Sequence, residues 1–121
     1  MKERWLLLGM VSAGIAGCAA LPEDVTKDGA RFDFVSANTP YSAAICIARN
    51  ARAMASTISG EERLLGDSST EVVVRQTGGA REPLATAQIH RDGVLSKVSV
   101  SVGRSVRADP RGFANKLMAG C

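Results

Sequence analysis

The turn signal at Asp92-Gly93 constrains the fold of this chain more than any other feature of its sequence. An aspartate and a glycine between two runs of alternating apolar and polar residues are typical of a two-residue type I′ β-hairpin. With this pair at the tip, both strands place apolar residues on one face and polar residues on the other, as a half-exposed antiparallel sheet requires. The predicted cross-strand pairs are Ala87–Val98 and Ala85–Val100 on the apolar face, and Gln88–Lys97 and Thr86–Ser99 on the polar face.

A three-stranded antiparallel meander is predicted around this hairpin, over residues 71–102. The valine-rich segment 71–75 forms the first strand, and segments 84–90 and 94–102 form the second and third. Gly78-Gly79 marks the turn between the first two strands. A phosphate-binding loop would need a following Lys-Ser/Thr pair and a strand-to-helix context, which are missing here, so a plain turn is expected.

Two helices with clear start signals flank the meander. Thr39 is the expected N-cap and Pro40 the first residue of a helix that ends at Gly60. Its predicted apolar face consists of Ala44, Ile47, Ala48, Ala51, Met54, Ala55 and Ile58. A second helix begins with Asp109 as N-cap and Pro110 at N1, and it places on one side Phe113, Leu117 and Cys121.

The sequence therefore predicts a two-layer α+β domain with the element order α-β-β-β-α. Both helices cover the apolar face of the three-stranded sheet, and Cys46 on the first helix meets Cys121 on the last. The segment Phe32-Asp33-Phe34-Val35 precedes the first helix. It fits either a short extra strand or a hydrophobic plug, and its pattern does not decide between them.

The N-terminus has the layout of an export signal. A basic start with Lys2 and Arg4 precedes an apolar stretch over residues 5–16 and a small residue, Gly17. The stretch is shorter than the roughly 20 residues that cross a bilayer, and glycines interrupt it, which argues against a retained membrane anchor. An ordinary secretory signal is the remaining alternative.

The tetrad Ile15-Ala16-Gly17-Cys18 resembles the lipobox of bacterial lipoproteins. The resemblance implies that Cys18 becomes the lipidated N-terminus of the mature chain. Several acyl chains attached there would hold a soluble domain stably at a membrane, whereas a single chain would not. Ala19, in place of an aspartate, implies sorting to the outer membrane, with the domain facing the periplasm. The implied organisation is a signal peptide over residues 1–17, a lipidated flexible tether over 18–31 and a small globular domain over 32–121.

Cysteine usage predicts one disulfide. With Cys18 lipidated, Cys46 and Cys121 remain, and two thiols in an oxidising compartment have one possible pairing. Closing a loop of this length contributes about 4 kcal/mol in the chain-entropy model. The sequence has no Cys-x-x-Cys motif and a single histidine, so neither a metal site nor a cofactor is expected.

A lipobox, a cysteine in an Ala-rich first helix, three strands and a last helix ending on cysteine are together similar to small uncharacterised proteobacterial envelope lipoproteins. This resemblance brings no activity and no catalytic residues with it. The expected role is a non-enzymatic accessory or adaptor domain that binds a protein partner at the outer membrane. The alternative is a small binding module for an anionic envelope ligand, either a lipid headgroup or a glycan. Nucleic acid is not an expected partner, because the chain carries a formal charge of only +3 and has no basic helix.

Two groups of polar residues are candidate binding surfaces. The polar face of the predicted sheet is lined by Arg75, Thr86, Gln88, His90, Lys97, Ser99 and Ser101. It fits either a docking platform for a protein partner or simple solvation. The second group follows the last strand and fits either a cluster for an anionic partner or three solvated arginines: Arg104, Arg107 and Arg111. A hydrolase site around His90 would need an activated nucleophile and an orienting partner, whereas serines on the solvent face of a strand are ordinary.

Overall fold

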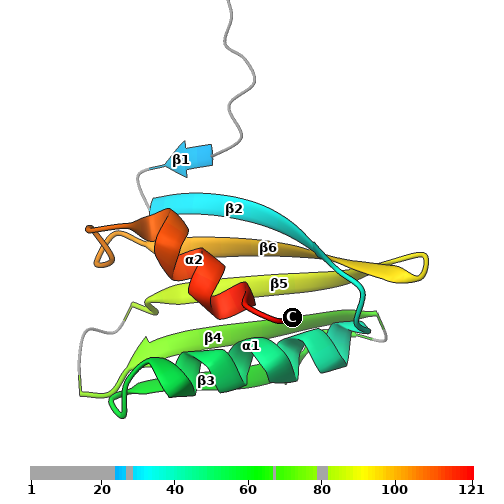
Figure 1. Cartoon of the computed structure of the whole chain (residues 1–121), viewed down its shortest axis with the longest axis horizontal. Coiled ribbons are helices and arrows are strands. Elements are labelled where there is room, and N and C mark those ends of the chain that lie inside the picture. Colours follow the sequence, from blue (N-terminus) through cyan, green and yellow to red (C-terminus); the bar gives the residue numbers. More distant parts are fainter. Residues whose placement is uncertain (1–23, 27–28, 67, 79–81) are drawn as a thin grey trace, which may run out of the picture.

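The computed structural model describes residues 24–26, 29–66, 68–78 and 82–121. The strands are β1 (Asp24–Thr26), β2 (Gly29–Ser36), β3 (Ile58–Leu64), β4 (Ser69–Gln76), β5 (Ala85–Asp92) and β6 (Leu95–Gly103). The helices are α1 (Pro40–Met54) and α2 (Pro110–Met118) (Figure 1). The predicted signal peptide, Cys18 and the second turn glycine, Gly79, lie outside the described residues.

The strands form one six-stranded antiparallel sheet in the order β1-β2-β6-β5-β4-β3, and both helices pack on one of its faces (Figure 1). The predicted three-stranded α-β-β-β-α arrangement is therefore wrong. Strands β4, β5 and β6 correspond to the meander, but β3 flanks them on one side, and β2 and β1 on the other. Packed helices lie about 8–10 Å apart and neighbouring strands about 4.8 Å apart, so two helices side by side need a wider sheet than three strands provide.

Strand β3 replaces the predicted last turns of the first helix. Helix α1 ends at Met54, and Ala55 is already extended, with φ −165° and ψ 154°. A Cβ on Gly60 would lie 2.9 Å from the Cα of Ala48, so this glycine permits close contact between α1 and β3 and is not the predicted helix stop. An edge strand has a neighbour on one side only and stays partly solvated, which accounts for the polar sequence of β3.

The segment 32–35, which fitted two alternatives, lies in β2 and pairs with β6. Phe32 points to the helices and is 2% exposed, whereas Arg31 and Asp33 are exposed on the opposite face. Strand β1 and the first three residues of β2 fall within segment 18–31, where the sequence predicts a flexible tether. Strand β1 pairs with the beginning of β2 and forms one edge of the sheet.

The central hairpin joins β5 and β6 as predicted, but the cross-strand partners differ from the prediction by two residues. Asp92 pairs with Leu95, so Gly93 and Val94 form the tip, and the glycine has φ +66°. The predicted pairs are replaced by Ala87–Val100, Ala85–Val102, Gln88–Ser99 and Thr86–Ser101. Each side chain still lies on its predicted face of the sheet, because side chains alternate with a period of two and the register has shifted by two residues. The observed register also places Ile89 opposite Val98, which buries one more apolar pair.

Both predicted helix starts are confirmed. Thr39 Oγ1 accepts a hydrogen bond from the N–H of Ser42 at 3.3 Å, and Asp109 Oδ1 accepts one from the N–H of Gly112 at 3.0 Å. Helix α1 covers β3, β4 and β5, while α2 covers β2 and β6. The core between the layers consists mainly of small and β-branched residues, including Ala43, Ala44, Ile47, Ala48, Ala51, Val72, Val74, Ile89, Val98, Val100, Val102 and Leu117.

Candidate functional site

The sheet face opposite the helices is uncovered and carries an open groove of about 870 Å³. Strands β2, β5 and β6 supply most of its lining, because alternate residues of each strand point away from the helices. The groove contains, from the predicted binding surface, Thr86, Gln88, His90, Lys97, Ser99 and Ser101. Strand β2 adds Arg31, Asp33 and Val35, which the sequence reasoning missed. The alternation of polar and apolar residues over 31–34 was the available signal.

Polar contacts in the groove join exposed groups. Arg31 Nε donates to Ser99 Oγ at 2.7 Å and lies 3.8 Å from Asp33 Oδ1. Lys97 Nζ lies 3.6 Å from Asp92 Oδ2. Exposed ion pairs of this kind contribute about 0–1 kcal/mol. The groove can therefore exchange them for contacts with a partner at low cost in free energy.

His90 forms a polar pair with Ser69 on the neighbouring strand, with Ser69 Oγ 2.8 Å from Nδ1. The two residues are direct cross-strand partners of β4 and β5. Within the described residues, no carboxylate bonds to the other ring nitrogen of His90. Ser96, one of the serines near the predicted site, is buried on the helix side of the sheet. The contact between Ser69 and His90 is therefore a polar pair between neighbouring strands.

Six large apolar side chains are exposed among the described residues, and all of them lie at one end of the sheet. At this end β5 joins β6, β3 leads to β4, and β2 leads to α1 (Figure 1). We call this set the apolar end; it consists of Val35, Tyr41, Leu64, Leu65, Val94 and Leu95. Val35 is 64% exposed and also lines the groove, so the two surfaces are continuous.

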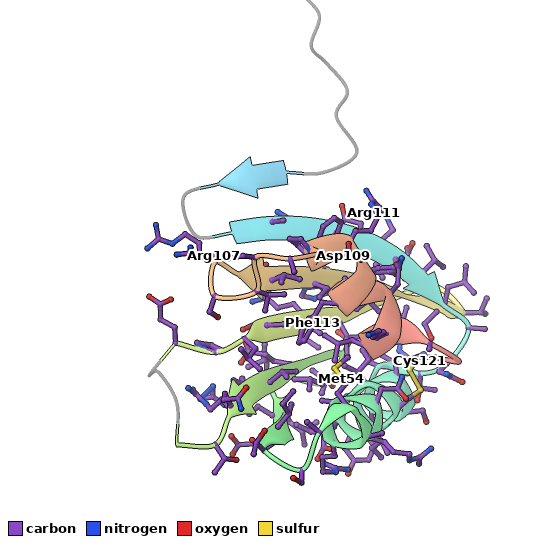
Figure 2. The ribbon with its side chains drawn as sticks, turned by 60° about the vertical axis from the view of Figure 1, so that its left-hand side comes forward. Met54, Arg107, Asp109, Arg111, Phe113 and Cys121 are labelled. Atoms are coloured by element: carbon purple, nitrogen blue, oxygen red, sulfur yellow. A yellow bond between two sulfur atoms is a disulfide. The ribbon has the colours of Figure 1, made fainter. Side chains whose placement is uncertain are left out.

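The three predicted arginines lie apart from the groove, on the helix side of the sheet. They line a second hollow of about 630 Å³ between β2, the loop after β6 and the start of α2 (Figure 2). We call it the arginine hollow, after Arg104, Arg107 and Arg111. Phe32 lines this hollow while its chain neighbours line the groove, so the two sites lie on opposite faces of β2. Arg75 lines neither of them and lies exposed on β4.

The predicted disulfide between Cys46 and Cys121 is confirmed, with an S–S distance of 2.06 Å and a Cα–Cα distance of 5.7 Å. Cys121 follows α2, which ends at Met118, and is not on the buried face of the helix itself as predicted. The bridge joins the middle of α1 to the end of the chain. The two helices are thereby linked covalently across the layer that they share.

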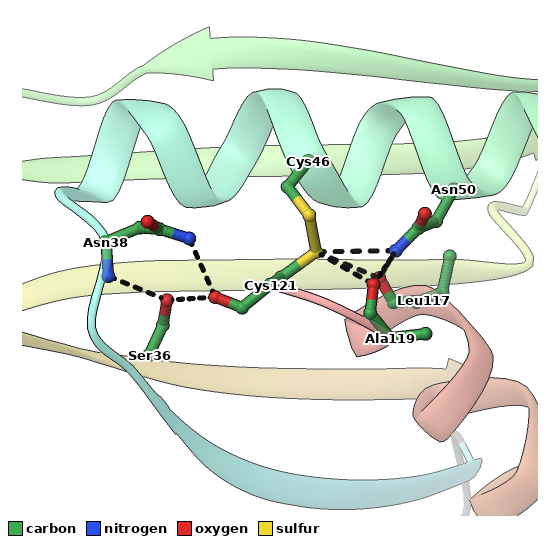
Figure 3. Close-up of a disulfide and its surroundings, with 7 residues drawn as sticks. All are labelled: Ser36, Asn38, Cys46, Asn50, Leu117, Ala119 and Cys121. Carbon is green, nitrogen blue, oxygen red and sulfur yellow. Dashed lines mark hydrogen bonds between the residues drawn. A yellow bond between two sulfur atoms is a disulfide. The ribbon is translucent and has the colours of Figure 1, made fainter.

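Polar side chains bind the backbone around the disulfide (Figure 3). Asn50 Nδ2 donates to the carbonyl oxygens of Leu117 at 2.8 Å and Ala119 at 2.9 Å. Ser36 Oγ and Asn38 Nδ2 both donate to the carbonyl oxygen of the last cysteine. We call Ser36, Asn38 and Asn50 the C-terminal clasp. Within the clasp, Asn50 satisfies carbonyl groups that the end of α2 leaves without partners inside the helix, and Ser36 and Asn38 hold the carbonyl of Cys121 beyond it.

No protein-family model matches the chain, and no curated protein matches its sequence. Across the parts of the chain that the structure describes, no helix is long and apolar enough to cross a membrane. In the same parts, no group of three His, Cys, Asp or Glu side chains is placed to hold a metal ion. The function is therefore inferred from the chemistry of the groove, the apolar end and the arginine hollow.

Proposed function

We propose that the chain is a lipoprotein of the bacterial outer membrane, lipidated at Cys18 and facing the periplasm, that binds a protein partner through its uncovered sheet face. The observation that carries the proposal is the groove between β2, β5 and β6 together with the apolar end beside it. In this role the domain is an adaptor and not an enzyme. Its partner is a protein of the same envelope.

The two parts of this surface contribute differently to binding. Val35 and Leu95, 64% and 41% exposed, lie on the uncovered face of the adjacent strands β2 and β6. Complete burial of such a side chain contributes about 1.5–3 kcal/mol, and binding hot spots are compact contacts surrounded by weaker ones. The hydroxyl, amide and imidazole groups of the groove would orient the partner by hydrogen bonds.

The N-terminal lipid would hold the domain close to its partner. Residues 19–23 separate Cys18 from the first residue of β1. A fully extended chain of this length spans about 20 Å. A partner attached to the same membrane then meets the domain at a raised effective concentration, so a surface of moderate affinity is sufficient.

A hydrolase centred on His90 is the enzymatic alternative. Its nucleophile would be Ser69, whose Oγ contacts the Nδ1 of His90. The pair lies on an open sheet face, whereas covalent catalysis by serine depends on a base that a third group orients and on a site that excludes water. A docking surface uses the same exposed groups without these requirements, which favours the adaptor.

Photo-crosslinking in intact cells tests the adaptor role. A photo-reactive side chain at Gln88 or at Val35 in the natively processed protein is expected to capture one recurrent protein partner. The same group at Arg49, exposed on α1, is the control and is expected to capture none. Val35→Glu should reduce capture from Gln88 at least about tenfold, the effect of losing one apolar contact of roughly 1.4 kcal/mol. Asn115→Glu, exposed on α2 outside both the groove and the apolar end, introduces the same charge and should leave capture unchanged.

Two outcomes contradict the adaptor role: equal capture from Gln88 and Arg49, or no reproducible capture from Gln88 and Val35. Lipidation is tested separately by labelling cells with a radioactive fatty acid. The native chain is expected to carry the label and a Cys18→Ser chain to lose it. Label that persists after this substitution would show that Cys18 is not the lipidated residue.

A further inference from the structure

We infer that the arginine hollow binds the phosphate groups of anionic phospholipids, as a second membrane contact beside the N-terminal lipid. The inference rests on the proposed function in one respect, the attachment of Cys18 to a membrane. It concerns the face of β2 opposite the groove, so a membrane and a protein partner could be bound at the same time.

The hollow is lined by Arg104 and Arg107 from the loop after β6 and by Arg111 from the first turn of α2. The guanidinium carbon of Arg111 lies over the ring of Phe32, 4.8 Å from its centroid, which fixes this cation along one wall. Arg104 and Arg107 are exposed, and neither forms an ion pair with a carboxylate in the described part of the chain. Guanidinium groups bind phosphate oxygens through paired hydrogen bonds, so this arrangement suits phosphate.

The lining retains an excess of positive charge. Asp109 is the one carboxylate among the described residues that line the hollow. Its Oδ1 accepts the hydrogen bond from the N–H of Gly112, as the N-cap of α2, and its role is to start the helix. The N-terminal end of α2 carries a partial positive charge at the same place and adds to the attraction for an anion.

The position of the hollow favours membrane phosphates over a small free anion. Gly29, which pairs with the last residue of β1, lines the hollow. Strand β1 itself begins six residues after Cys18, so the lipidated residue lies within about 20 Å of it. An open hollow walled partly by backbone offers little enclosure for a free ion. Headgroups that lie side by side in a membrane surface can reach several arginines together.

Vesicle binding of the mature chain, residues 18–121 with Cys18→Ser, separates this contact from the lipid anchor and from the apolar signal segment. Binding to mixed phosphatidylcholine–phosphatidylglycerol vesicles is compared with binding to phosphatidylcholine alone. The triple variant R104Q/R107Q/R111Q is expected to lose the preference for anionic vesicles by on the order of 100-fold, about fivefold for each arginine. The double variant R104Q/R107Q leaves Arg111 on Phe32 and should lose about 25-fold. The matched control R49Q/R63Q/R91Q removes the same charge elsewhere and should stay within about twofold of the unchanged chain.

Equal losses in the two triple variants, or no preference for anionic vesicles, would overturn the site. Inorganic phosphate is the second probe. If the chain without vesicles binds inorganic phosphate more tightly than it binds anionic vesicles at the same phosphate concentration, and the triple variant loses this binding, the hollow takes free phosphate and the membrane assignment is wrong. A failure of lipidation appears separately, as missing fatty-acid label on the native chain, and does not change the vesicle result.

Discussion

At the scale of single residues, Gly60 sets the distance between α1 and the edge of the sheet. A Cβ here would lie 2.9 Å from the Cα and 3.0 Å from the carbonyl oxygen of Ala48, and backbone atoms cannot rotate away. Gly60→Ala is therefore expected to lower the free energy of unfolding by about 1–3 kcal/mol in urea titrations. Gly66→Ala is the control, because nothing lies within 4 Å of its Cβ position. Similar losses in both variants would contradict the packing role of Gly60.

Asn50 has a comparable role at the end of the chain, where its amide donates to two carbonyl oxygens. Asn50→Asp replaces the donor with a carboxylate that faces the same oxygens. The expected loss is about 1–3 kcal/mol of unfolding free energy, seen as a lower midpoint in thermal unfolding with the disulfide intact. Asn115→Asp, exposed on α2, introduces the same charge and should leave the midpoint nearly unchanged. A large shift from this control would point to net charge as the cause.

The disulfide and the C-terminal clasp around it differ in how far the sequence could predict them. The Cys46–Cys121 bridge was predicted from the expectation of export with Cys18 lipidated, which leaves two thiols and one pairing and requires no knowledge of the fold. The C-terminal clasp binds backbone oxygens, and these come together only once α1, α2 and β2 are in place. No spacing in the sequence marks such contacts.

At the scale of elements, the local sequence pattern and the position in the sheet together decided which strands were predicted. Strands β4, β5 and β6 are interior; β4 contains the run Val72-Val73-Val74, and apolar and polar residues alternate over 85–90 in β5 and 97–102 in β6. The edge strand β3 is mostly polar, and Ile58 continued the helical spacing of α1 into it. Strand β2 shows alternation over a segment too short to separate a strand from a plug. Strands β4, β5 and β6 can therefore be recognised from their own residues. Strand β3 cannot, because its place in the sheet depends on packing against α1.

The hairpin between β5 and β6 turns at Gly93 and Val94. Gly93 has φ +66°, where a side chain costs about 1–2 kcal/mol, so Gly93→Ala is expected to destabilise the domain by that amount in urea unfolding. Val94→Ala is the control at the second tip position, where the side chain is 89% exposed, and should change stability by less than about 0.5 kcal/mol.

The register of the hairpin can be checked separately by NMR. Cross-strand proton contacts between Ile89 and Val98 are expected, and contacts between Ile89 and Ser96 would contradict the register.

At the scale of the whole molecule, the disulfide joins residues 75 apart in sequence. The double variant C46A/C121A is expected to lose about 4 kcal/mol of unfolding free energy, because the open chain gains entropy when unfolded. This is a large part of the roughly 5–15 kcal/mol that keeps a domain folded. Urea unfolding without reductant measures the loss. A change below about 1 kcal/mol would mean that the C-terminal clasp and core packing hold α2 without the bridge.

The sequence predicted the part of the candidate site that lies on the β5–β6 hairpin and missed the part that lies on β2. The hairpin pattern was enough to assign Thr86, Gln88, His90, Lys97 and Ser99 to one polar face. The contribution of β2 was missed because its pairing with β6 joins segments far apart in the sequence. The arginines were predicted as a second, separate group after β6, but no pattern in the sequence indicates that they lie on the other side of the sheet from the groove.

The covalent bridge also determines how the domain responds to mechanical force. In the proposed lipidated form, a pull between the N-terminus and the last residue loads the chain at β1, and the edge ladder of β1 and β2 opens one hydrogen bond at a time. Once β2 has separated from β6, the tension beyond Cys46 passes through the sulfur atoms directly to Cys121, and the four strands from β3 to β6 bear none of it. The extension is then limited to the segment before Cys46, about 3.3–3.6 Å for each residue released. If Cys18 is lipidated as proposed, the domain can lose β1, β2 and the start of α1 under load while β3 to β6 stay folded.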